Sequence, residues 1–81
     1  MNTPTPEHLQ LMRAFLHGYI DEGALTSITL DRARTVLQKV TPADVTIDGM
    51  IVSRILRRLG FQRSYLPADA AVITYRKVIL A

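Results

Sequence analysis

The sequence predicts a small α+β domain in which helix, strand, helix, helix, strand and strand follow one another. Two observations carry this prediction. Up to residue 59, most apolar side chains recur every three or four residues, as in helices that pack on a core, and after Gly60 the spacing changes to two. The 81 residues suffice for one domain, without repeats or an interior linker. We expect residues 1–4 to be a flexible end and residues 5–81 to be the domain.

The first helix is expected over about residues 5–22. Thr5 can accept a hydrogen bond from a free backbone N–H as the N-cap, and Pro6 suits the first helical position. Gly23 is the expected stop. Glycine costs about 1 kcal/mol relative to alanine inside a helix, so at Gly18 the helix ends earlier or a neighbour approaches closely. The stripe expected to face the core consists of Leu9, Met12, Leu16 and Tyr19, with Phe15 and Ile20 beside it.

A short strand and a second helix are expected next. The β-branched segment 27–29 is long enough for a minimal strand, and Thr29 then suits the N-cap of a helix over about residues 30–40. Pro42 should end this helix, because proline lacks a backbone donor and disfavours helical geometry at Thr41 before it. The predicted buried face consists of Leu30, Ala33, Val36, Leu37 and Val40.

The third helix, over about residues 48–59, has the clearest periodicity in the chain. Thr46 or Asp48 can cap it, and Gly60 follows as a left-handed terminator. Its inward face is formed by Ile51, Val52, Ile55, Leu56 and Leu59. Its outward face, at helical spacing, is formed by Met50, Ser53, Arg54, Arg57 and Arg58.

A β-hairpin is expected over about residues 61–79, with strands at 61–66 and 72–79 and a turn at 67–71. Such a hairpin needs a surface to pack on, and Phe61 should be buried beneath it. A shift of one residue would reverse which face is buried, so the sides on which Tyr65 and Tyr75 lie stay open. Stacking on single-stranded bases is therefore open for both.

The charge of the chain is uneven. The formal net charge is +3, with −1 over residues 1–38 and +4 over residues 39–81. This asymmetry predicts a polyanionic partner at the C-terminal half.

Several function classes lack support in the sequence. There is no cysteine, and His8 and His17 do not share a short metal-ligand spacing, so we expect neither a metal nor a cofactor. No nucleophile–base pair or phosphate loop is present, which argues against an enzyme with a small-molecule substrate. The longest uninterrupted apolar run, 78–81, is far shorter than the roughly 20 residues that span a bilayer, and residues 1–6 are unlike a signal peptide. We therefore expect a cytoplasmic protein without membrane contact.

One segment resembles a known family. Residues 55–61, Ile-Leu-Arg-Arg-Leu-Gly-Phe, followed by Arg63 and a basic aromatic hairpin, resemble the C-terminal winged-helix domains of phage and plasmid primases and helicases. The resemblance covers roughly residues 43–79, and its motif is short. It implies a winged helix-turn-helix fold of three helices and a C-terminal hairpin, the wing. Wing turns of that family usually carry glycine, whereas residues 67–71 have none, which leaves the contacts of the wing tip in doubt.

The resemblance implies that the third helix enters the major groove of DNA while the wing lies along the backbone or in a neighbouring groove. Arg54 and Arg57 are the expected base readers, since a guanidinium can bond bidentately to guanine. Ser53 can contact base or phosphate, and Met50 a thymine methyl group. The expected phosphate contacts are Arg58, Arg63, Arg76 and Lys77, and the expected further wing contacts are Gln62, Ser64 and Tyr65.

These basic residues also have structural interpretations. Arg57 and Arg58 can be the solvated flank of a core helix. Arg76 and Lys77 are adjacent in a strand, so they face opposite sides, and positive charge on an edge strand discourages aggregation without any ligand.

The sequence thus predicts a DNA-binding domain, with duplex DNA as partner, in a replication or regulatory protein of a mobile element. The first alternative is a winged helix used for protein–protein contact or as a homodimer, which the apolar end 78–81 favours. RNA binding is a third hypothesis, without a motif of its own.

Overall fold

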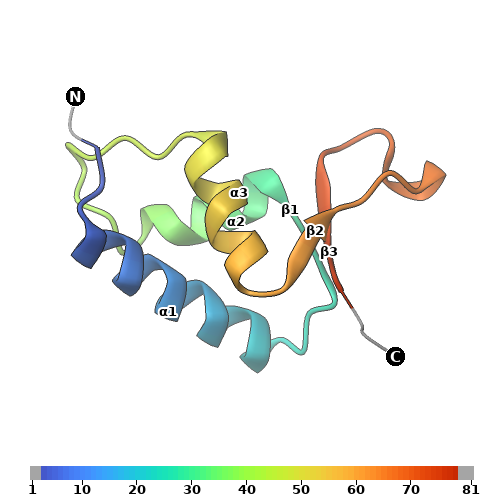
Figure 1. The fold of residues 1–81 in the computed structure, drawn as a ribbon, viewed down its shortest axis with the longest axis horizontal. Helices are drawn as coiled ribbons and strands as arrows, with labels where there is room; N and C mark the ends of the chain where they lie inside the picture. The colour runs from blue at the N-terminus through green and yellow to red at the C-terminus, as the bar shows by residue number, and fades with distance from the viewer. Residues whose placement is uncertain (1–2, 79–81) are drawn as a thin grey trace.

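The computed structural model describes residues 3–78, in which three helices and a three-stranded antiparallel sheet occur in the predicted order (Figure 1). This confirms the α+β class. None of the helices among these residues has the length and apolar character needed to cross a membrane.

Helix α1 (Pro6–Glu22) begins as predicted, with Thr5 as its N-cap. The Thr5 hydroxyl accepts from the His8 backbone N–H at 3.1 Å, and His8 Nδ1 accepts from the Thr5 backbone N–H at 3.2 Å. His8 therefore completes a capping box, in which the cap and the third helical residue satisfy each other's backbone donors. Met12, Leu16 and Ile20 are buried, whereas Phe15, which was expected beside the core stripe, is 39% exposed.

The end of α1 differs in detail from the prediction. Gly23 is the C-cap but keeps right-handed geometry, and the left-handed residue is Ala24, with φ +49°. The backbone N–H groups of Ala24 and Leu25 donate to the carbonyls of Asp21 and Ile20, which is the Schellman pattern of helix termination. At Gly18 the helix continues, and within residues 3–78 no atom outside the adjoining helix backbone lies within 4 Å of where a Cβ would stand, so none of these residues is the expected close neighbour.

Strand β1 (Ser27–Thr29) leads directly into α2 (Leu30–Gln38), whose N-cap is Thr29 as predicted. The helix ends two residues before the predicted 40. The Thr41 hydroxyl donates to the Leu37 carbonyl at 2.7 Å, and the Lys39 and Val40 backbone N–H groups make tighter bonds, three residues back. The Thr41 hydroxyl thus bonds a carbonyl near the end of α2, and the α-helical pattern ends before Pro42.

Helix α3 (Gly49–Arg58) lies between the predicted limits of 48 and 59. Of the two proposed caps, Asp48 is the one used, since its carboxylate accepts from the Ile51 backbone N–H at 2.9 Å. Gly60 has φ +89°, which confirms the left-handed terminator. Val52, Ile55 and Leu56 are buried, and Ile51 and Leu59 pack against the core as partly buried residues.

The strands β2 (Phe61–Arg63) and β3 (Thr74–Lys77) are shorter than predicted. They are joined by the loop 64–73, which contains a 3₁₀ turn η1 (Pro67–Asp69), rather than by a five-residue turn. Residue 79, the predicted end of the hairpin, lies outside the described residues. Strand β3 is central, with β1 on one side and β2 on the other, so the isolated segment 27–29 finds its partner through Ile28 opposite Tyr75.

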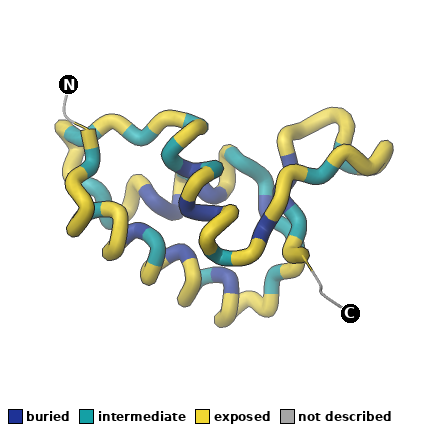
Figure 2. The backbone as a smooth tube through the Cα atoms, in the orientation of Figure 1, coloured by how far each residue is buried: buried dark blue, intermediate teal, exposed yellow. Residues whose placement is uncertain are grey.

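The core lies where the three helices meet the sheet (Figure 2). Phe61 is 1% exposed, as expected of the residue after the helix terminator, and Tyr75 is 5% exposed. Tyr65 is 82% exposed. The structure therefore shows which tyrosine is buried: β3 directs Tyr75 inward, whereas Tyr65 lies two residues beyond the end of β2. The largest fully buried side chains are Phe61, Met12, Leu16, Leu37, Leu56 and Val52.

Candidate nucleic-acid interface

The outward face of α3 carries an arginine stripe. Arg54, Arg57 and Arg58 are exposed, and their spacing of three and four residues puts them side by side on consecutive turns. Met50, at the first turn, is 67% exposed. Arg57 and Arg58 also lie in the last turn, where positive charge is favourable beside the C-terminal end of the helix dipole. Arg57 and Arg58 therefore stabilise the C-terminal end of α3 in addition to being exposed to solvent.

Ser53 faces the hairpin rather than open solvent. Its hydroxyl accepts a hydrogen bond from the Tyr75 hydroxyl at 2.8 Å, and the residue is only half-exposed. The outward position that the sequence predicts for Ser53 therefore differs from the observed one. The bond connects α3 to β3, so Ser53 helps to hold the helix at a fixed angle to the sheet instead of standing ready for base or phosphate.

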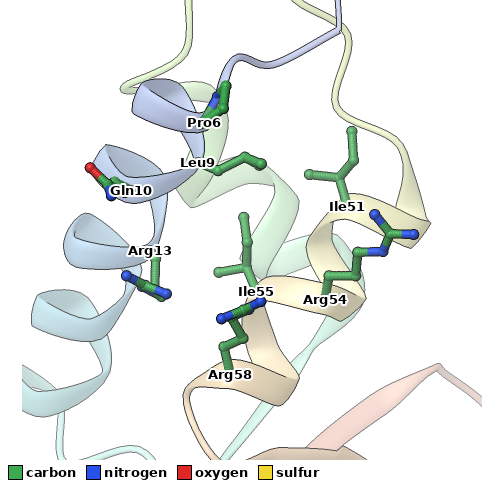
Figure 3. Close-up of a pocket in the computed structure, with 8 residues that line it drawn as sticks. All are labelled: Pro6, Leu9, Gln10, Arg13, Ile51, Arg54, Ile55 and Arg58. Atoms are coloured by element: carbon green, nitrogen blue, oxygen red, sulfur yellow. The ribbon is translucent and has the colours of Figure 1, made fainter.

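On one side of the arginine stripe is a groove between α1 and α3 (Figure 3). Arg13 of α1 and Arg58 of α3 extend into this space over an aliphatic floor (Figure 3). The volume of this α1–α3 groove is about 450 Å³. Its lining consists of Pro6, Leu9, Gln10, Arg13, Ile51, Arg54, Ile55 and Arg58.

Arg13 is the residue that the sequence analysis missed. It lies on the first helix, more than 40 positions before Arg54, in the half of the chain with net negative charge. Only the packing of α1 against α3 brings the two into one groove. One feature of the sequence could have pointed to Arg13: it follows the buried Met12 and so lies beside the core stripe of α1.

On the other side of the stripe is a smaller hollow beside β2. This β2-side depression has a volume of about 390 Å³, and its lining consists of Arg57, Phe61, Gln62, Arg63 and Tyr65. The Arg63 guanidinium carbon lies 5.3 Å from the centroid of the Tyr65 ring, within the range of a cation–π contact. Four of the predicted contact residues are therefore brought together here, namely Arg57, Gln62, Arg63 and Tyr65.

The structure does not group Arg76 with the arginines of α3. Its guanidinium donates two hydrogen bonds to Asp69, from Nε at 2.6 Å and from Nη2 at 3.1 Å. The hydroxyl of Ser64 donates to the same carboxylate. The hydrogen bond from Arg76, followed by the one from Ser64, lowers the pKa of Asp69, and the hydrogen bond to Asp69 raises the pKa of Arg76. Arg76 is thus a closing contact of the loop 64–73, with its charge balanced by Asp69.

Lys77 is exposed at the end of β3, opposite Phe61 in the register. Because neighbouring residues of a strand point to opposite faces, Lys77 and Arg76 project on opposite sides, as the sequence predicts. Neither lines the α1–α3 groove or the β2-side depression.

The arginines of the interface have no acidic partner within the described part of the chain. Among residues 3–78, none of Arg13, Arg54, Arg57 and Arg58 forms an ion pair, whereas Arg76 does. Nor do these residues contain a group of three or more histidines or acidic residues that could hold a metal ion. The face formed by the α1–α3 groove, the arginine stripe and the β2-side depression is therefore suited to bind an extended polyanion.

No protein-family model matches the chain, and the searches of curated proteins and of solved structures found no match either.

Proposed function

We propose that this chain is a winged-helix domain that binds DNA through α3, with duplex DNA as its main ligand. The observation that carries the proposal is the stripe of three unpaired arginines on an exposed helix, continued by Arg13 on one side and Arg63 on the other. A helix of this kind fits the major groove of B-form DNA, where arginine can bond guanine bidentately.

The arrangement of the other elements supports the proposal. A short strand between α1 and α2 pairs with β3, and the β2–β3 hairpin stands beside the C-terminal end of α3. In a winged helix this geometry presents the third helix and the hairpin to the same nucleic acid. The aliphatic floor of the α1–α3 groove gives the arginine stems an apolar surface to lie on while their charged ends reach phosphates.

Within this proposal the residues have different roles. Arg54 and Arg57 read bases, and Arg13, Arg58 and Arg63 contact phosphates. Arg76 stays hydrogen-bonded to Asp69, and Lys77 adds positive charge outside the α1–α3 groove and the β2-side depression. The resemblance to winged-helix domains of phage and plasmid primases and helicases extends the proposal to a replication or regulatory protein of a mobile element, in the cytoplasm.

Salt dependence of binding tests the proposal. If Arg13, Arg58 and Arg63 each neutralise one phosphate, the logarithm of the affinity should fall against the logarithm of salt concentration with a slope of about −3. Fluorescence anisotropy on a labelled duplex measures this slope. The Arg54→Glu/Arg57→Glu variant should lose most of the affinity for duplex.

The matched control is Arg32→Glu/Lys39→Glu, which changes the net charge equally at two exposed residues of α2 and its C-cap. This control should retain most of the binding. Equal losses in both variants would mean that only the overall charge matters and would remove α3 as the reader. Absence of binding even at low salt would contradict the proposal as a whole.

A second candidate function has one observation in its favour. Leu11 and Phe15 are 55% and 39% exposed and lie one turn apart on the outer face of α1. This apolar face suits a protein partner or a second copy of the chain. Sedimentation showing a concentration-dependent dimer that Leu11→Glu disrupts, together with absence of DNA binding, would favour this candidate.

A further inference from the structure

We infer that the β2-side depression is a subsite for an unpaired nucleotide, whose base stacks on Tyr65 while its phosphate is bound by Arg63. The inference rests on the proposed function and specifies it, because it makes the preferred ligand a duplex that continues into a single strand.

The exposure of Tyr65 is the first observation. At 82%, it is the most exposed large hydrophobic residue among those described, whereas Tyr75, on the neighbouring strand, is 5% exposed. The Tyr75 hydroxyl has a partner in Ser53. The ring of Tyr65 instead presents apolar area to solvent at the rim of an arginine-lined depression. A flat aromatic ring in that position is suited to stack on another flat ring.

The backbone on both sides of Tyr65 is held by hydrogen bonds. The Ser64 backbone N–H donates to the Thr74 carbonyl at 2.8 Å, and the Ser64 hydroxyl donates to Asp69. The Leu66 backbone N–H donates to Ser64 Oγ at 3.3 Å. Because Asp69 is itself bound by Arg76, the loop is closed around the residue that carries the ring. The position of Tyr65 is thus defined by the fold, which reduces the ordering cost of stacking a ligand on it.

Arg63 gives the ring an orientation. The Arg63 guanidinium lies over the ring at 5.3 Å from the centroid. Because Tyr65 is highly exposed, further surface of its ring stays open to solvent. A base stacked on Tyr65 would have positive charge close by, and its own 5′ or 3′ phosphate could bond to that guanidinium. Arg57, from α3, lines the same depression and supplies a second positive charge.

The remaining polar group is the amide of Gln62, which is exposed and lines the depression. An amide offers both donors and an acceptor, so it can bond the edge of any base without strong selection. The depression of about 390 Å³ is within the size range of small-ligand sites. The residues that line the depression therefore match the parts of a nucleotide, with the ring of Tyr65 for the base and the guanidinium of Arg63 for the phosphate.

The unpaired state of the nucleotide follows from geometry. Inside a continuous duplex both faces of a base are covered by neighbouring bases, so a protein ring cannot stack there unless the base is flipped out. Arg57 lies on the same helix face as Arg54, the proposed duplex reader, one turn away. The subsite therefore lies where the end of a duplex bound to α3 would pass into a single strand.

The experiment compares two fluorescent probes, a blunt hairpin duplex and the same hairpin with a single-stranded extension of four thymidines at its 5′ or 3′ end. Wild-type protein should bind an extended probe about 5- to 100-fold more tightly than the blunt one, as expected for stacking of one base. Tyr65→Ala should remove this preference, so that the blunt and the extended probes are bound with equal affinity. Tyr65→Phe, which keeps the ring, should retain it.

A second measurement places the base. With 2-aminopurine as the first unpaired nucleotide, wild type and Tyr65→Phe should quench its fluorescence, and Tyr65→Ala should not. Equal affinity of the wild type for blunt and extended probes, or an unchanged preference in Tyr65→Ala, would overturn the inference. In both cases salt-dependent binding to the blunt hairpin would leave the proposed function standing. Binding of neither probe would overturn both.

Discussion

The helical part of the molecule and the loop 64–73 are held together by different forces. In the helical part, side chains such as Leu16, Leu37 and Leu56 are fully buried against one another. Most of the loop is exposed (Figure 2), including Leu66 at 53%. The loop is held mainly by the carboxylate of Asp69, which accepts from Arg76 and Ser64. Apolar burial therefore supports α3 and its arginines, whereas polar bonds at the surface support Tyr65.

This difference means that the two sides of the proposed interface can be altered independently. A change in the helical core should unfold the domain and remove all binding together. A change in the loop should alter the β2-side depression while the arginine stripe stays in place.

Leu56→Ala should have the largest effect on stability. Removing a fully buried leucine side chain costs about 2–5 kcal/mol. An 81-residue domain has a free energy of unfolding of about 4–12 kcal/mol, so this variant should be close to unfolding at 37 °C. Urea denaturation followed by circular dichroism measures the loss. The control is Leu66→Ala in the loop, expected to change stability by only about 0.5 kcal/mol. Equal losses would contradict the proposed difference between the two regions.

Two glycine substitutions separate helix propensity from backbone geometry. Gly18→Ala should stabilise the domain by about 1 kcal/mol, because Gly18 lies inside α1 with no atom near the added methyl group. Gly60→Ala should destabilise the domain by about 1–2 kcal/mol, because its φ of +89° is unfavourable for a residue with a Cβ. Steric crowding is not the cause, since there is space for the added Cβ at Gly60 too. Thermal unfolding should therefore shift in opposite directions for the same chemical change. A loss of stability in Gly18→Ala would indicate a neighbour of α1 that the described residues do not include.

The hydrogen bond between Tyr75 and Ser53 connects the two regions. Tyr75→Phe should reduce stability by about 0.5–1.5 kcal/mol, because it removes the donor while keeping the buried ring. Ser53→Ala removes the acceptor, and the double variant should lose less than the sum of the two single losses. Chemical denaturation of the four proteins gives this coupling. Additive losses would show that the bond contributes nothing to the attachment of α3 to β3.

The smallest effect is expected at Asp69 and depends on pH. The pKa of Asp69 is lowered in the folded protein, so its contribution to stability is present above the ordinary carboxyl pKa and is lost as pH falls through the lower folded value. The Tm of wild type should exceed that of Asp69→Asn from pH 7 down to about pH 4, and the difference should shrink below that. Glu22→Gln, at an exposed residue of α1, serves as the control for a general change in charge. If the difference in Tm between wild type and Asp69→Asn grew at lower pH, the Asp69 carboxylate could not be the group that holds the loop.

Local signals in the sequence identified much of the helical part. Thr5, Thr29 and Asp48 cap the three helices because a short polar side chain beside a free backbone N–H acts over a few residues only. Gly60 ends α3 for an equally local reason, its freedom to adopt positive φ. The exposure of Arg54, Arg57 and Arg58 followed from helical periodicity alone.

The hairpin was harder to predict, because strand ends depend on pairing rather than on local propensity. The alternation of residues 61–66 suggested a longer strand, but pairing stops at Arg63 opposite Tyr75, and Ser64 and Asp69 draw the chain into a loop instead. The positions of Tyr65 and Tyr75 likewise required the register. Arg76 was expected to contact phosphate, since no spacing rule pairs it with an aspartate seven residues away.

By itself the sequence determined the α+β class, the order of the elements, the helix caps and the exposed arginines of α3, because each depends on interactions between residues close in the chain. The tertiary structure alone decided that Arg13 joins those arginines and that Ser53 is held by Tyr75. It also decided that Tyr65 stands exposed, with Arg63 over its ring, in a depression that Arg57 of α3 also lines. Each of these contacts joins side chains whose proximity depends on how helices and strands pack, which no short segment specifies.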